Sequence, residues 1–176
     1  MIKSIPIPTA GVSLGLAALG NLLQPYSPLM KYTCGILAAI LLAMLLIKIL
    51  RYPKLVHADM TGNPILGSVA ATFFMTTMQL CVYIKDFAPF LCEAIWLAAV
   101  AAHAILIIWF SKNFMLNLEL KNVFPTFFIA YVGIVVASVT APAFGYLTLG
   151  YYIFWFCWHW SPTAISITRY LKLPSH

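Results

Sequence analysis

The chain has 176 residues, of which 63% are hydrophobic and only 8% are charged, and its formal net charge at pH 7 is +6. Soluble domains have about 25% charged residues, so this composition excludes a soluble globular protein. Disordered chains are highly charged and poor in aromatic residues, whereas Phe, Trp and Tyr make up 15% of this sequence. We therefore expect a protein that folds in a lipid bilayer.

Several stretches are apolar enough to cross a membrane as helices, which takes about 20 residues for a hydrocarbon core of about 30 Å. The charge-free run from Asn122 to Thr168 is too long for one crossing. We place a break near Pro142 and Gly145, because Pro lacks an amide donor and Gly commonly follows a helix end. No segment alternates in polarity as the strands of a transmembrane barrel do. The sequence predicts an all-α integral membrane protein with a single transmembrane domain, residues 1–176, and helices in hairpins over about 5–23, 30–50, 63–84, 88–110, 122–141 and 146–170.

The positive charges predict an orientation, because Lys and Arg concentrate in cytoplasmic loops. With the N-terminus inside, the outer side carries only Lys31 and Lys85. This asymmetry predicts a multi-pass protein of the cell (plasma) membrane with both termini cytoplasmic. Topology and anionic lipid headgroups then account for the net charge, and no basic run with interleaved aromatics indicates nucleic-acid binding. The cytoplasmic side would carry Lys3, Lys48, Arg51, Lys54, Lys112, Lys121, Arg169 and Lys172.

Polar side chains are distributed unevenly between the predicted helices. Stretches 36–47 and 94–110, in the second and fourth helices, contain no Ser, Thr, Asn or Gln, which predicts that these helices face lipid. The odd-numbered helices instead carry small and polar residues at helical spacing. These are Thr9, Ser13, Ala17 and Asn21 in the first; Ser68, Thr72, Thr76, Gln79 and Tyr83 in the third; and Thr126, Ala130, Gly133, Ala137 and Thr140 in the fifth.

Two interpretations of these faces remain open. Small residues such as Gly11, Gly15 and Gly133 let helix backbones approach closely, so one interpretation is that the faces serve helix packing alone. Their recurrence on alternate helices favours an inner ring of odd helices around an aqueous path, shielded by an outer ring of even helices. The only acid near a predicted span is Glu93, at the outer end of the fourth helix. A cation pathway needs an acidic ring or a carbonyl filter and a proton pump needs buried carboxylates, so the pattern favours an anion or a neutral solute.

We select five candidate pore-lining residues from the odd helices. The hydroxyls of Ser13, Thr72 and Thr76 would donate to a partly dehydrated anion, while Phe127 and Tyr131 would narrow the path. Other aromatic residues that could contribute to an apolar constriction are Phe73, Phe74 and Phe128.

An enzymatic alternative comes from the segment Gly11 to Gly15, which matches the G-x-S-x-G pattern around Ser13, with His103 and His159 in other predicted helices. That motif works at a strand-to-helix turn, whereas this copy lies within a predicted helix. We therefore expect no enzyme activity and keep an intramembrane serine hydrolase as an alternative. We expect no metal or cofactor, because the cysteines lack metal-ligand spacing and are typical of packing positions: Cys34, Cys81, Cys92 and Cys157.

Two segments resemble a known family. The first helix, from Pro6 to Asn21, and the segment from Lys121 to Pro142 resemble the tellurite-resistance/dicarboxylate transporter family, the bacterial relatives of plant slow anion channels. The resemblance extends over essentially the whole chain. It implies a ten-helix fold of five hairpins with kinked odd helices around a pore, a homotrimer in a lipid bilayer, and transport of chloride, malate and other C4-dicarboxylates, or tellurite-type oxyanions.

The chain differs from that family in length, since it supplies only the first six helices. The residue that occludes the family's pore is a Phe on a later helix, and it has no counterpart here. We therefore expect a truncated form of the ten-helix fold, which is inactive alone or works with a second chain. A non-transporting membrane assembly subunit is the alternative function.

Overall fold

The computed structural model describes residues 5–115 and 125–171, and it is helical throughout, with no strand in these two ranges. This confirms the all-α class. Short turns of other helix types lie at Ser111–Met115 (π) and Ala141–Phe144 (3₁₀). The α-helices are α1 (Thr9–Leu23), α2 (Pro28–Arg51), α3 (Pro53–Gly62), α4 (Pro64–Val69), α5 (Ala71–Ile84), α6 (Pro89–Phe110), α7 (Phe127–Val132), α8 (Val135–Thr140) and α9 (Leu147–Leu171).

Within the described residues, four helical segments are long and apolar enough to cross a membrane, and α1 is a shorter apolar helix. The expected start of the fifth helix at residue 122, and the charges at Lys3, Lys121 and Lys172, lie outside the described residues. The four segments are Pro28–Arg51, Pro64–Ile84, Pro89–Phe114 and Phe127–Phe144.

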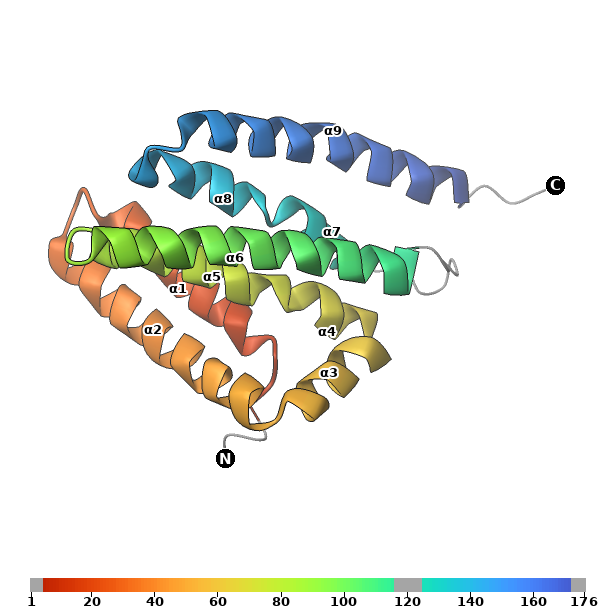
Figure 1. Cartoon of the computed structure of the whole chain (residues 1–176), viewed down its shortest axis with the longest axis horizontal. Helices are drawn as coiled ribbons and strands as arrows, with labels where there is room; N and C mark the ends of the chain where they lie inside the picture. Colours follow the sequence, from red (N-terminus) through yellow and green to blue (C-terminus); the bar gives the residue numbers. More distant parts are fainter. Residues whose placement is uncertain (1–4, 116–124, 172–176) are drawn as a thin grey trace.

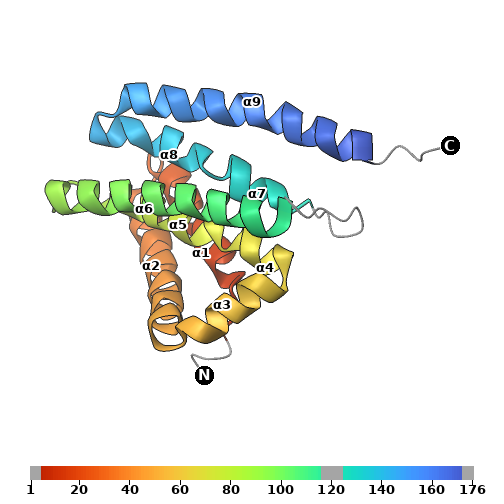
Figure 2. The same ribbon diagram turned by 45° about the vertical axis from the view of Figure 1, so that its right-hand side comes forward.

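The helices form three hairpins, α1 with α2, α4 and α5 with α6, and α7 and α8 with α9 (Figure 1). The three hairpin turns gather at one end of the molecule, while α3 and the π turn lie toward the other (Figures 1 and 2). Proline begins α2, α3, α4 and α6, where its fixed φ suits a helix and its missing N–H leaves no bond unmade. The connection between α8 and α9 depends on Gly145, which ends the 3₁₀ helix. Its φ of 81° lies in the left-handed region.

The ten-residue helix α3 was not among the predicted elements. Its sequence is too short and too polar for a crossing, and none of its residues is buried. It is joined to the end of α2 by Lys48, whose Nζ lies 3.8 Å from the Asp59 carboxylate and donates to Ile5 O at 2.6 Å. The side chain of Lys48 is almost fully buried, so it links the segment before α1, the end of α2 and α3.

Two spans are broken about two turns after they begin. The third span changes from α4 to α5 at Ala70, and the fifth changes from α7 to α8 at Gly133 and Ile134. At the first break the Thr72 hydroxyl donates to Val69 O at 2.7 Å. Since α4 contacts α7 and α5 contacts α8, the two broken spans lie side by side.

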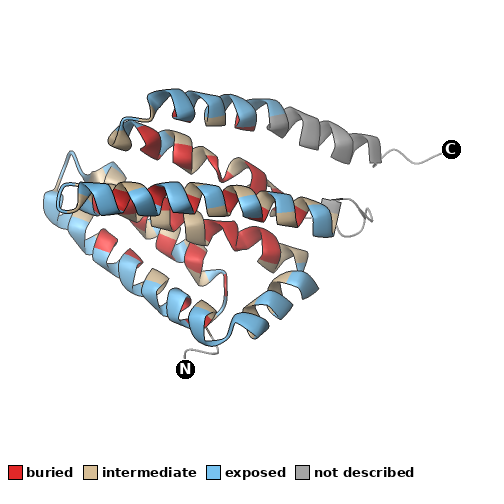
Figure 3. Cartoon of the chain, viewed as in Figure 1, coloured by how far each residue is buried: buried red, intermediate tan, exposed pale blue. Residues whose placement is uncertain are grey.

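The odd spans were predicted to be inner and the even spans outer, and the third and fifth spans are indeed the more buried ones. In the most apolar stretch of each span, 22% of the residues are buried in α2, whereas 44% are buried in the third span and 44% in the fifth. The inner helices α1, α5 and α8 contact one another in series, and Figure 3 shows exposed residues along the outer faces of α2, α6 and α9. These outer faces present large apolar side chains, including Ile36, Ile40, Leu50, Ile105, Ile108, Tyr151, Trp155 and Trp158.

The outer helix α6 also has an inward face. The predicted lipid-facing stretch 94–110 has a fully buried face, on which Trp96, His103 and Phe110 have no exposed surface. These residues recur every seven positions, so they lie on one side of the helix. Counting only Ser, Thr, Asn and Gln missed this face, because its polar groups belong to an indole and an imidazole.

Tyr83 of α5 packs closely against both helices of the first hairpin. Its hydroxyl donates to Ala17 O of α1 at 2.5 Å, and the Lys31 ammonium lies 5.4 Å from its ring centre. The ring occupies the space above two glycines, Gly20 of α1 and Gly35 of α2, where an added Cβ would collide with it. Tyr83 therefore joins α1, α2 and α5 at the hairpin-turn end.

Replacing Gly35 with Ala should destabilise the protein by about 1–3 kcal/mol, the usual cost of overpacking. The new Cβ would lie 2.6 Å from Tyr83 Cε1. The control is Gly15→Ala on α1, where a Cβ meets no atom within 4 Å and Ala favours the helix by about 1 kcal/mol. Thermal unfolding in detergent measures both, and equal shifts for the two variants would contradict the packing described here.

Candidate functional site

The five candidate pore-lining residues are all buried within the chain, each exposing 7% or less of its surface. They lie at three helix interfaces. Thr76 of α5 contacts α1, and Thr72 lies one turn before it on the same helix, whereas Phe127 and Tyr131 of α7 face α6. Ser13 of α1 is directed toward α2.

The α1–α5 interface is built from hydroxyl groups on α5. The Thr76 hydroxyl lies 2.7 Å from Thr72 O and 3.3 Å from Ala10 O of α1, so it is within reach of a carbonyl on each helix. One turn further along α5, Asn21 Nδ2 donates to Gln79 Oε1 at 2.5 Å. The polar face predicted on the third helix therefore lies against α1.

Ser13 makes its contact with a different helix from the threonines. Its hydroxyl donates to Ala38 O of α2 at 2.7 Å, and the side chain has no exposed surface. It lies inside α1, not at a strand-to-helix turn, so the geometry of a serine hydrolase nucleophile is missing at this position.

The α6–α7 interface brings Phe127 and Tyr131 against Phe110. The ring centres of Phe110 and Phe127 are 4.9 Å apart and those of Phe110 and Tyr131 are 6.1 Å apart, both in edge-on geometry. The Tyr131 hydroxyl also forms a 2.7 Å hydrogen bond with the Ser111 hydroxyl. Both aromatic candidates are thus fixed by the end of α6.

The three glycines predicted to pack helices differ in their surroundings. A Cβ at Gly133 would lie 2.7 Å from Met75 Sδ of α5, so this glycine allows the fifth span to approach the third. At Gly11 and Gly15 a Cβ meets no atom within 4 Å. For these two, a role in helix packing stays a prediction that would require a neighbour beyond the described chain.

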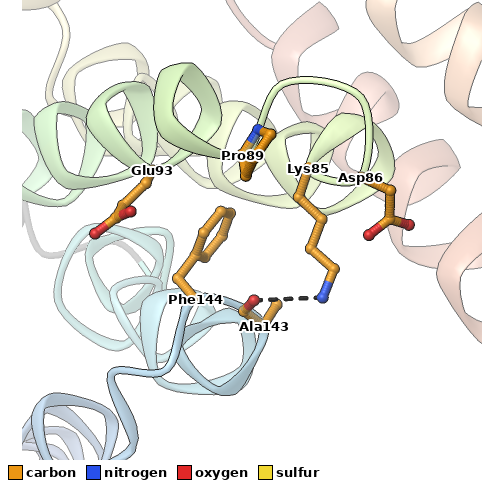
Figure 4. Close-up of a pocket in the computed structure, with 6 residues that line it drawn as sticks. All are labelled: Lys85, Asp86, Pro89, Glu93, Ala143 and Phe144. Carbon is orange, nitrogen blue, oxygen red and sulfur yellow. Dashed lines mark hydrogen bonds between the residues drawn. The ribbon is translucent and has the colours of Figure 1, made fainter.

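The hairpin-turn end contains an open pocket of about 430 Å³ between the α5–α6 turn and the 3₁₀ turn (Figure 4). Lys85 Nζ lies 3.3 Å from Ala143 O, between the carboxylates of Asp86 and Glu93, and Phe144 forms one wall. One ammonium and two carboxylates give this pocket a net negative charge. It is therefore unsuited to an anion, and the inner helices remain the better candidate for an anion path.

Behind the pocket, Trp96 of α6 organises a cluster that sequence reasoning missed. Its Nε1 donates to the Thr140 hydroxyl at 2.8 Å, and its ring stacks with Phe144 and Tyr146 at 5.3 and 5.8 Å between centres. The Tyr146 hydroxyl donates to Glu93 Oε1 at 2.5 Å. This bond raises the pKa of the Tyr146 hydroxyl, because ionisation would lose it and place two negative charges together.

The cysteines and the possible metal ligands are also accounted for. Cys34, Cys81, Cys92 and Cys157 are free thiols, and three of them lie in the core around Trp96. Nowhere in the described ranges do three or more His, Cys, Asp or Glu side chains come close enough to hold a metal ion.

These features define a multi-pass α-helical membrane protein whose uncharged inner helices are shielded by apolar outer ones. The chain belongs to the voltage-dependent anion channel family, whose model matches residues 4–174. This confirms the family that the first helix and the segment from Lys121 to Pro142 resemble. A search of curated proteins found no match. Members of this family are anion channels and transporters rather than enzymes.

Tyr146→Phe should lower the melting temperature at neutral pH, because it removes the bond to Glu93. A Tyr hydroxyl has a pKa of about 10 in an unfolded chain, and its pKa is raised here. The stabilisation by this bond is therefore complete below pH 10 and is lost as the pH rises through the raised pKa.

Melting curves of the wild type and of Tyr146→Phe between pH 7 and the alkaline limit measure this difference. It should be constant up to about pH 10 and then close. A difference that persists unchanged at the highest pH would contradict the role given to the Tyr146 hydroxyl.

Proposed function

We propose that this chain takes part in moving small anions across the plasma membrane, as a channel or secondary transporter. The anion would be chloride, a C4-dicarboxylate such as malate, or a tellurite-type oxyanion. The observation that carries the proposal is the family match over residues 4–174. The inner helices support it, because α1, α4, α5, α7 and α8 contain no charged residue.

Charge along the chain supports an anion rather than a cation. The described cationic side chains lie at the helix ends, with Lys31 and Lys85 near the hairpin turns. At the opposite end, Lys48 and Arg51 occupy the last turn of α2, and Lys112 lies in the π turn after α6. At the hairpin-turn end, Asp86 and Glu93 offset the two lysines, so the cations that would attract anions toward an uncharged interior are those at the opposite end. We propose that this more cationic end is cytoplasmic.

The hydroxyls of the inner helices are the proposed anion ligands. Thr72 and Thr76 now donate to backbone carbonyls. A hydroxyl hydrogen rotates about the C–O bond, so each can turn its donor toward a passing anion while its carbonyl remains in the helix. Thr72 and Thr76, together with Ser13, are the proposed polar lining of a pore, and Phe127 and Tyr131 would narrow it. Further helices or a second chain would complete this pore.

Oligomeric assembly belongs to the same proposal. The large apolar side chains on the outer faces of α2, α6 and α9 fit a lipid environment. The family resemblance supports a homotrimer embedded in the bilayer.

The test is anion flux into liposomes containing the full chain, measured with radiolabelled malate and chloride. Thr76→Val keeps the shape of the side chain and removes the hydroxyl, and we expect it to change flux more than Cys34→Ala on α2. An equal effect of the two substitutions would contradict the role of Thr76.

A wild-type chain without flux, alone or with a co-purified partner, would instead favour an assembly subunit. Covalent labelling of Ser13 by a fluorophosphonate probe would revive the hydrolase alternative. We expect no labelling, because the Ser13 hydroxyl is fully buried and bonded to Ala38 O.

A further inference from the structure

His103 lies in the middle of α6, and its side chain has no exposed surface. Its Nε2 is 3.0 Å from Ala130 O of α7. A carbonyl oxygen only accepts hydrogen bonds, so Nε2 must carry the hydrogen. Nδ1 is buried and has no hydrogen-bond partner.

The unpartnered Nδ1 determines the charge of the ring. A second proton there would create a cation whose new N–H has no acceptor, in an apolar interior where the nearest ring is Phe74, 6.3 Å away. Burying a charge in this way is much more costly than leaving a neutral nitrogen lone pair without a partner. The contacts therefore define a neutral imidazole with its hydrogen on Nε2.

Ala130 O is a carbonyl that the break in the fifth span leaves without its helical donor. In a continuous helix, Ile134 N–H would bond to it. Around the break the backbone bonds run instead from Gly133 N to Ile129 O, from Val136 N to Gly133 O and from Ala137 N to Ile134 O. His103 supplies the donor from the neighbouring helix, as a broken helix in a membrane requires.

The end of α6, two turns beyond His103, contacts the two aromatic residues on either side of Ala130. Phe127 lies one turn before Ala130 and Tyr131 directly after it, and both pack on Phe110. The hydrogen bond from His103 therefore fixes the axial position of α7 relative to α6. It thereby also fixes the positions of the Phe127 and Tyr131 rings.

We propose that His103 is a positioning residue for transport. Its hydrogen bond to Ala130 O stabilises the break between α7 and α8 and determines the positions of the Phe127 and Tyr131 side chains. This inference rests on the proposed function for its transport consequence, whereas the tautomer and the bond are tested without it.

The flux test compares three variants of the full chain in liposomes. His103→Leu removes the donor and leaves Ala130 O unsatisfied, so anion flux should fall about tenfold. His103→Gln keeps an N–H donor of similar reach and should restore most of the flux. Leu106→Ala, one turn along the same buried face, is a control for lost packing and should reduce flux less than His103→Leu at equal thermal stability.

Nitrogen NMR of ¹⁵N-histidine-labelled protein in bilayers tests the tautomer directly. The His103 signals are those missing from the His103→Gln spectrum. We expect a protonated, hydrogen-bonded Nε2 and an unprotonated Nδ1 without a hydrogen bond.

A hydrogen on Nδ1, or a doubly protonated ring at neutral pH, would overturn the proposal. Equal flux losses in His103→Leu and Leu106→Ala, or a His103→Gln variant as impaired as His103→Leu, would overturn it as well. If the wild type carries no anion at all, the proposed function fails and the positioning role in transport falls with it, while the NMR result still decides the bond between His103 and Ala130.

Discussion

The fold depends on the requirement that backbone N–H and C=O groups find partners inside the membrane, where no water replaces them. Continuous helices meet this requirement by themselves, and the two broken inner spans do not. Each break is accompanied by a side-chain donor: the Thr72 hydroxyl bonds to Val69 O at the first, and the His103 imidazole bonds to Ala130 O at the second. The donor at the first break comes from its own span, and the donor at the second comes from the preceding hairpin. The second break is therefore a property of two helices together.

Close packing imposes a second constraint, which the chain meets by pairing large rings with small residues. Tyr83 occupies the space over Gly20 and Gly35, and Met75 lies against Gly133. Apolar side chains gain little from leaving lipid for a protein interior, so contact area and interhelical hydrogen bonds must hold the spans together. The Tyr83 hydroxyl bond to Ala17 O combines both effects in one side chain.

The sequence was sufficient for the class of fold, because composition and the length of apolar runs determine an all-α membrane protein. It also indicated which face of the third span is polar, since Thr72 and Thr76 have helical spacing. It did not show that Ser13 faces α2, because a spacing along one helix contains no information about its neighbour. The roles of His103 and Trp96 in joining helices were missed for a related reason: a lone imidazole or indole in an apolar stretch has no periodic signal. The structure identifies them through their partners, Ala130 and Thr140.

The serial arrangement of the hairpins has a consequence for biosynthesis. α1 and α2 contact each other and then α5, while α7 and α8 contact the second hairpin and α9. Each pair of helices therefore finds most of its partners in itself and in the pair made just before it. A hairpin that has just left the ribosome can then pack onto the preceding one without waiting for a segment that is made later.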